Sequence, residues 1–225
     1  MIHRRRPAER HLTEEVEVEL EVKRSRFITH VARVDDQESA RAMIARVRSQ
    51  WPDARHHCSA FIVAVAGQHD VEHSSDDGEP SGTAGRPMLD VLRGAELGQV
   101  CAVVVRYFGG VLLGTGGLVR AYSDSVQAAL AHLGTVSVER RQLISVDVAH
   151  ADVGAVENAL QAWGDPPVRR EFGATRAQLW VAPADPNQLR DRLAALSQGR
   201  AVLREEGTID WEAPEETLSG DLPAR

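Results

Sequence analysis

Two polar, glycine-rich segments carry most of the residues that could bind or transform a ligand. The first reads SSDDGEPSGTAGR over residues 74–86, and the second reads YFGGVLLGTGGLVR over residues 107–120. Between them, residues 101–105 form a continuous apolar run, which predicts a fully buried strand. Nothing else in the chain gathers so many residues that packing alone does not require.

The second segment has the composition of an anion-binding loop. A strand, a glycine loop and the start of a helix leave free backbone N–H groups that point at negative charge. Thr115 stands at the expected N-cap, because Leu118, Tyr122 and Val126 follow at helical spacing. Arginine suits phosphate because its planar fork donates two hydrogen bonds at once. We therefore predict an anion site made of Arg106, Gly109, Gly110, Gly114, Thr115, Gly116, Gly117 and Arg120.

Two standard phosphate-binding motifs are excluded in this segment. A P-loop requires GxxxxGK[ST], and residues 109–115 contain no lysine. A dinucleotide fingerprint fails because Val119 stands where the third glycine belongs. A purely structural interpretation stays open, in which the glycines make a tight turn and both arginines pair with acidic residues.

The first segment holds three carboxylates that could bind a hard cation or act as acid and base. Carboxylates in such loops more often pair with arginine or cap a helix, so we predict no metal site. Residues 67–86 are expected to form one long loop that packs against the second segment, with a carboxylate near Arg106 or Arg120. The loop residues singled out are Asp76, Asp77, Gly78, Glu79, Pro80, Ser81, Gly82, Thr83, Gly85 and Arg86.

No complete catalytic constellation is present in the sequence. Ser81 lies in PSGTAG, which is not the GxSxG of a nucleophile elbow. Four histidines lie near Cys58 in the sequence, but their spacing is not that of a zinc finger or of HExxH. The sequence therefore favours a binding protein over an enzyme and predicts no cofactor. The histidines are His56, His57, His69 and His73.

Composition narrows the class of partner. The chain has 225 residues and a net charge of −7, so nucleic acid would need a local basic patch. No DNA specificity is evident. No apolar stretch approaches the length of a membrane span, and the N-terminus lacks a signal-peptide segment. Cys58 and Cys101 both lie in apolar runs, which predicts reduced thiols and a cytoplasmic protein. The oligomeric state is not determined by the sequence.

Hydrophobic periodicity predicts a two-domain α+β chain. Residues 16–22 alternate as a half-buried strand with an acidic outer face, and Ser25 and Arg26 are expected to turn it. From about residue 138 the elements follow the order βαββαβ, the ferredoxin-like arrangement. We expect the two domains to fold separately. The predicted divisions are a flexible arm at 1–14, a first domain at 15–137, a ferredoxin-like domain at 138–212 and an acidic disordered tail at 213–225.

Four stretches together resemble the YigZ/IMPACT family. They are SDDGEPSGTAGRPML at 75–89, VVVRYFGGVLLGTGGLVRAYS at 103–123, SRFI at 25–28 and DARHHCSAFIV at 53–63. The resemblance covers nearly the whole chain and identifies it as a bacterial two-domain member. It implies a first domain similar to the second domain of a small-subunit ribosomal protein and to domain IV of elongation factor G. It also implies a ferredoxin-like second domain similar to another elongation-factor module.

The resemblance also bears on function. Eukaryotic relatives act in translational control, by competing for a ribosome-associated activator of a starvation-responsive kinase. We therefore predict that the first domain binds an anionic partner, either RNA or a ribosomal surface. An RNA-binding protein of this kind is expected to spread basic residues over an open sheet face. Two alternatives stay open: an enzyme acting on a phosphorylated small molecule through Asp76, Asp77 and Glu79, and a protein–protein module in translational or stress regulation.

Overall fold

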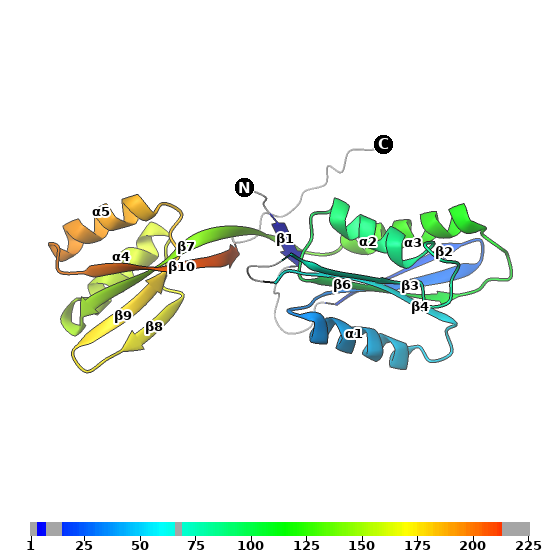
Figure 1. Cartoon of the computed structure of the whole chain (residues 1–225), viewed down its shortest axis with the longest axis horizontal. Coiled ribbons are helices and arrows are strands. Elements are labelled where there is room, and N and C mark those ends of the chain that lie inside the picture. The colour runs from blue at the N-terminus through cyan, green and yellow to red at the C-terminus, as the bar shows by residue number, and fades with distance from the viewer. Residues whose placement is uncertain (1–3, 8–14, 66–68, 213–225) are drawn as a thin grey trace. The chain divides into compact units, whose positions relative to one another are not determined.

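The computed structural model describes residues 4–7, 15–65 and 69–212 (Figure 1). The chain divides into two compact units, the first ending at Ser137 and the second spanning Val138–Glu212. Each unit has its own hydrophobic core and is described by itself. Within the described residues, no helix is long and apolar enough to cross a membrane.

The first unit is an antiparallel sheet with helices on both faces. The strands pair in the order β2-β3-β6-β4-β5. Helix α1 covers one face, and helices α2 and α3 cover the other (Figure 1). The expected open sheet face is therefore absent from the described part of this unit. The elements are β2 (Val16–Val22), β3 (Ser25–Arg33), α1 (Gln37–Gln50), β4 (His56–Val63), β5 (Val71–Ser75), α2 (Gly85–Gly94), β6 (Val100–Tyr107) and α3 (Thr115–Leu130).

Strand β6 lies at the centre of this sheet, and the predicted buried strand is confirmed. Its apolar residues are fully buried on both sides. Ala102 and Val104 pack toward α2 and α3, while Cys101 and Val103 pack toward α1. A strand sandwiched between two helical layers needs no polar face, which explains the continuous apolar run.

Three local predictions in this unit are wrong. Lys23 and Arg24 turn the chain between β2 and β3, with φ values of 47° and 67°, whereas Ser25 already belongs to β3. Part of the predicted long loop forms β5, an edge strand on β4, so the loop itself spans only residues 76–84. Gly114, not Thr115, is the N-cap of α3, and its φ of 73° favours glycine.

The N-terminal residues 4–7 form the short strand β1 (Arg4–Pro7), where a flexible arm was expected. The remainder of the predicted arm, and the predicted tail at 213–225, lie outside the described residues.

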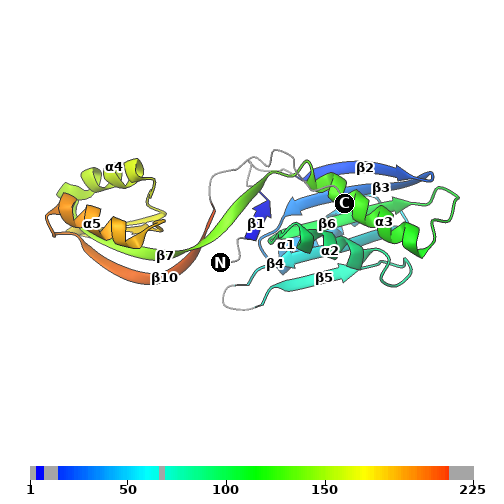
Figure 2. The same cartoon turned by 90° about the horizontal axis from the view of Figure 1, so that it is seen from above.

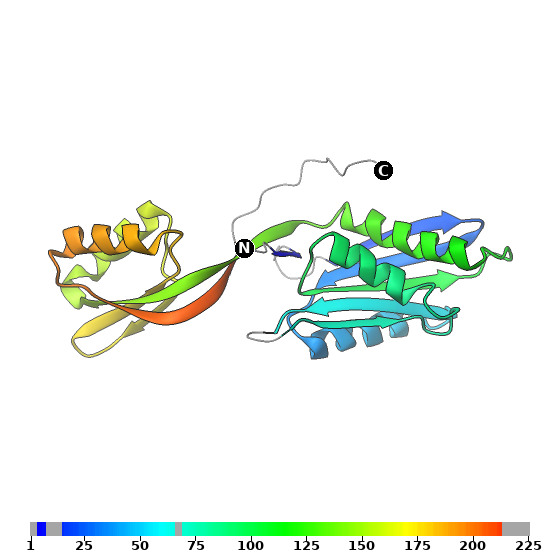
Figure 3. The same ribbon diagram turned by 45° about the horizontal axis from the view of Figure 1, so that its top comes forward.

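The second unit has four antiparallel strands, which belong to a five-stranded sheet, and two helices on one face of them (Figure 3). Its strands pair in the order β10-β7-β9-β8, and its elements follow the order βαββαβ. Its core includes Ile144, Leu160, Leu179 and Leu193, all fully buried. The elements are β7 (Thr135–Ala149), η1 (His150–Asp152), α4 (Val153–Trp163), β8 (Arg169–Phe172), β9 (Arg176–Val181), α5 (Pro186–Ser197) and β10 (Val202–Glu212).

We predict that residues 1–137 and 138–212 each unfold cooperatively when expressed alone, because each retains its own buried core. The second fragment should begin no later than Val138, since Val138 pairs with Glu212 across β7 and β10. Circular dichroism during heating tests each fragment. A gradual, non-cooperative melt of both fragments would show that the halves depend on one another.

Candidate anion-binding site

Three connecting segments meet at one end of the first sheet. Antiparallel pairing brings four strand termini to the same end of the sheet. They are the start of β3, the end of β6, the start of β4 and the end of β5. The β2–β3 turn, the loop at 76–84 and the glycine-rich segment at 108–114 therefore gather there (Figure 2). Both segments singled out in the sequence thus lie at this loop end.

A buried ion pair joins the two segments. Arg106 Nη1 lies 2.5 Å from Glu79 Oε1, and the two side chains are only 7% and 4% exposed. The hydroxyl of Tyr122, from α3, donates to the same Glu79 oxygen over 2.8 Å. The predicted contact between the acidic loop and an arginine is therefore present. Arg106, which was predicted as an anion ligand, therefore has an internal carboxylate partner.

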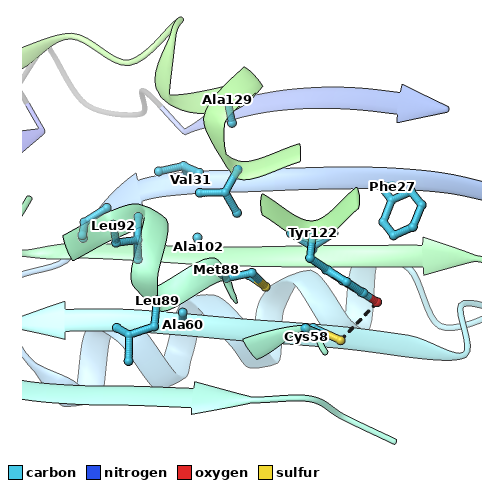
Figure 4. Close-up of a cluster of buried hydrophobic side chains, with 14 of the residues drawn as sticks. Phe27, Val31, Cys58, Ala60, Met88, Leu89, Leu92, Ala102, Tyr122 and Ala129 are labelled. Atoms are coloured by element: carbon cyan, nitrogen blue, oxygen red, sulfur yellow. Dashed lines mark hydrogen bonds between the residues drawn. The ribbon is translucent and has the colours of Figure 1, made fainter. Parts of the chain in front are cut away.

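Cys58 extends this buried network from strand β4. Its thiol lies 3.3 Å from the Tyr122 hydroxyl (Figure 4) and 3.0 Å from the Asp76 carbonyl oxygen, and its one proton can be donated to either oxygen. Burial raises the pKa of Cys58 to about 12 and also raises the pKa of Tyr122. Both groups therefore stay protonated at neutral pH and act as hydrogen-bond donors, not as nucleophiles.

The other two carboxylates of the loop are engaged within the protein as well. Asp76 accepts from the backbone N–H groups of Gly82, Ala84 and Gly85 over 2.8, 3.0 and 2.9 Å. Burial alone would raise the pKa of Asp76, but these three donors outweigh it and hold that pKa below its usual value.

Asp77 holds the loop against α1 and β4. It accepts from Arg48 over 2.8 Å and from the backbone N–H of His57 over 2.7 Å. Burial opposes ionisation of Asp77, but these donors lower its pKa overall. Nowhere in the described residues do three or more histidine, cysteine, aspartate or glutamate side chains come together as a metal site.

The other residues of the acidic loop form hydrogen bonds or ion pairs with nearby residues, or are exposed to solvent. The Thr83 hydroxyl donates to the Pro80 carbonyl over 2.6 Å, and Ser81 is exposed. Arg86 pairs with Asp90 one turn along α2. Of the loop residues, only Glu79 and Pro80 line the neighbouring cleft.

A cleft of about 380 Å³ lies at the start of helix α3. No side chain caps this helix, and the first amide with an intrahelical bond is that of Leu118, which donates to Gly114. A side chain added at Gly116 would meet nothing within 4 Å, so the helix start is open. The cleft is lined by Arg55, His56, Glu79, Pro80, Arg106, Phe108, Leu112, Leu113, Gly114, Thr115 and Leu118.

Charged and apolar groups together line this cleft. Arg55 is exposed, whereas Arg106 forms part of the buried wall, with its Nε without a hydrogen-bond partner. Phe108 and Leu112 are 50% and 84% exposed. The arrangement can therefore bind an anion at the helix start and an apolar or aromatic group beside it.

Arg106 and Arg120 do not converge on one ligand. Arg120 lines a separate hollow of about 170 Å³, whose other members include Lys23 and Asp124. Arg55 takes the place that Arg120 was expected to fill beside the helix start. Sequence reasoning missed Arg55, because only the pairing of His56 with Arg106 brings it to the cleft.

Most arginines of the first unit contact a carboxylate. Among the side chains that the structure describes there, the basic ones without a carboxylate partner are Lys23, Arg24, Arg41, Arg55 and Arg120. Arg41 lies on α1, whereas the other four border the glycine-rich segment. Positive charge without an internal partner therefore collects at the loop end of a protein whose net charge is −7.

The fold and motifs place the chain in a known class. The Impact N-terminal domain matches residues 23–130. An IMPACT family member from Haemophilus influenzae is 40% identical over 187 residues, which are 83% of this chain and 91% of the relative. The IMPACT family member YigZ from Escherichia coli is 53% identical over 115 residues, 51% of this chain and 56% of the relative.

A solved structure agrees over nearly the whole chain. A crystal structure of a hypothetical protein is 38% identical, covers 90% of this chain and 97% of its own, and gives a TM-score of 0.62. The chain belongs to the IMPACT family.

We predict that Glu79→Gln lowers the free energy of unfolding by roughly 3 kcal/mol, because it leaves the Arg106 charge buried without a counter-charge. Urea unfolding at neutral pH measures this loss. Arg120→Ala is the control, since Arg120 is exposed and should change stability little. A double variant, Glu79→Leu with Arg106→Met, should lose less than Glu79→Gln. Equal stability of Glu79→Gln and the parent would show that the pair is not needed.

We predict that Asp76→Asn lowers stability at neutral pH by about 1 kcal/mol, the scale of a lost helix cap. A carboxyl whose folded pKa is depressed stabilises above its unfolded pKa, and this contribution disappears as pH falls through the folded pKa. The parent and the variant should therefore converge in acid. Unfolding curves between about pH 7 and about pH 3 test this convergence. A constant difference across that range would contradict it.

Proposed function

We propose that this protein binds RNA, free or exposed on a ribosomal surface, through a phosphate held at the start of helix α3. The observation that carries the proposal is one cleft lined by an uncapped helix start, by the unpaired Arg55 and by exposed apolar side chains. Each of these features costs stability or solubility in isolation. Together they match the phosphate and the base of a nucleotide.

The phosphate half of the site rests on two sources of positive potential. The unbonded amides at the start of α3 donate hydrogen bonds to an anion, and the helix dipole favours negative charge there. Arg55 adds a full charge and a fork of donors. Glu79 opposes them only weakly, because its charge is matched by Arg106.

The base half of the site rests on Phe108. Its ring is half exposed, and the Arg106 guanidinium lies over it, 5.8 Å from the ring centroid. Unstacked bases of single-stranded RNA stack on such rings without regard to sequence. Leu112 extends the same apolar surface.

The family supplies the biological setting for this proposal. Resemblance to the IMPACT family implies translational control in the cytoplasm. The proposed analogies are a first unit similar to a ribosomal-protein domain and to domain IV of elongation factor G, and a ferredoxin-like second unit. The βαββαβ order of the second unit supports the latter analogy.

The enzymatic alternative has less support. It requires Asp76, Asp77 and Glu79 as metal ligands or acid and base groups. All three accept hydrogen bonds from backbone amides or basic side chains that hold the loop together. We therefore propose a binding protein without catalysis at this site.

The test is the binding of fluorescein-labelled oligouridylate, followed by anisotropy at several salt concentrations. The affinity of the parent should fall as salt rises. Arg55→Ala should weaken binding about tenfold, the scale of one charge-assisted hydrogen bond of about 1.5 kcal/mol. Gly116→Val should also weaken binding, because its side chain covers the helix start while the space there leaves the fold intact.

Arg41→Ala is the matched control for charge. It removes an unpaired arginine from α1 and should leave binding unchanged. Absence of salt-dependent binding by the parent would overturn the proposal. An equal loss for Arg55→Ala and Arg41→Ala would assign binding to net charge and reject the cleft.

A further inference from the structure

A second cationic surface lies on the other side of the glycine-rich segment. Lys23 and Arg120 line the hollow of about 170 Å³, together with Val22, Leu113, Gly117, Ala121 and Asp124. Neither Lys23 nor Arg120 has a carboxylate partner in the described part of the chain, and neither does Arg24 next to Lys23. The three cations come from two elements that are distant in sequence.

The β2–β3 turn holds two of these cations in an unfavourable backbone conformation. Lys23 and Arg24 both have positive φ, at 47° and 67°. Two-residue hairpin turns with positive φ at both positions strongly favour Asn-Gly, because L side chains are strained there. Both side chains are exposed, so packing does not explain their identity. A strained conformation that packing does not require is a reason to look for a function.

The turn is fixed against the glycine-rich segment. A side chain added at Gly109 would lie 2.0 Å from the Arg24 carbonyl carbon, so only glycine permits this approach. The Gly109 amide also donates to the Ser25 hydroxyl over 3.2 Å. Leu113 lines both the cleft and the hollow. The two cationic sites are therefore neighbours with a set separation.

We propose that the hollow lined by Lys23 and Arg120, with Arg24 next to Lys23 in the turn, binds a second phosphate of the same RNA strand. This inference rests on the proposed function of the cleft and names its ligand more closely. Two cationic sites that share Leu113, one of them also lined by the exposed Phe108 and Leu112, match the alternation of phosphates and bases along a single strand. The ligand is then a polynucleotide, and inorganic phosphate or a mononucleotide fills only the cleft.

The strained turn provides a test in which stability and binding move in opposite directions. Lys23→Asn with Arg24→Gly supplies the residues that the turn prefers, so the melting temperature should rise. The same double variant should weaken oligouridylate binding about five- to tenfold, as expected for two exposed ion pairs. It should also reduce the slope of log affinity against log salt by about 0.7 for each lost phosphate contact.

Two further variants change the charge of the hollow without altering the turn. Arg120→Ala should weaken oligouridylate in the same direction, and Asp124→Asn should strengthen it by removing a negative charge from the hollow. None of these changes should alter the binding of inorganic phosphate, measured by its displacement of a short labelled dinucleotide. Arg55→Ala should weaken both probes, because it acts on the cleft.

The outcomes separate the two proposals. If the double variant is more stable yet binds oligouridylate as tightly as the parent, the second site is rejected. If Arg55→Ala weakens oligouridylate binding in the same experiment, the proposed function of the cleft still holds. If Arg55→Ala has no effect on either probe, the proposed function itself fails. Displacement of oligouridylate by polyglutamate at equal charge concentration would reject RNA in favour of an acidic protein.

Discussion

The first unit depends on the buried ion pair between Glu79 and Arg106. Arg106 belongs to the central strand β6, and Glu79 belongs to the loop that follows β5. Tyr122 adds α3 to the same carboxylate, so one buried charge fixes a strand, a loop and a helix together. Because the pair is buried, loss of either partner destabilises the fold strongly: an unmatched charge among apolar neighbours costs far more free energy than a lost surface contact. The same ion pair therefore fixes the part of the cleft wall that Glu79 and Arg106 form.

Sequence patterns recovered the features that depend on local periodicity. The apolar run at 101–105 predicted a strand buried on both faces, and residues 16–22 predicted an alternating strand. The βαββαβ order of the second unit followed from alternating periods of two and of about four residues. The two glycine-rich segments were also recognised, together with the contact between an acidic residue and an arginine.

The features that were missed depend on contacts between distant residues. Arg106 was predicted as an anion ligand, with pairing to an acidic residue left open. The sequence does not reveal that Arg106 and Tyr122 converge on the Glu79 carboxylate. Arg55 reaches the cleft only through the register that pairs His56 with Arg106. Strand β5 was taken for loop because an edge strand tolerates polar residues on its exposed sides. The turn at Lys23 and Arg24 lacks the Asn-Gly signal of its backbone conformation.

Helices cover both faces of the first sheet, so the proposed RNA site is formed by the loops at one end of it. The residues of the scaffold and those of the proposed binding surface are consequently almost separate sets. Members of such a family can exchange exposed side chains at the turn and in the glycine-rich segment without disturbing the layers beneath. Under the proposed function, a chimera that carries the exposed residues of one relative's loops on the core of another would bind with the preference of the loop donor.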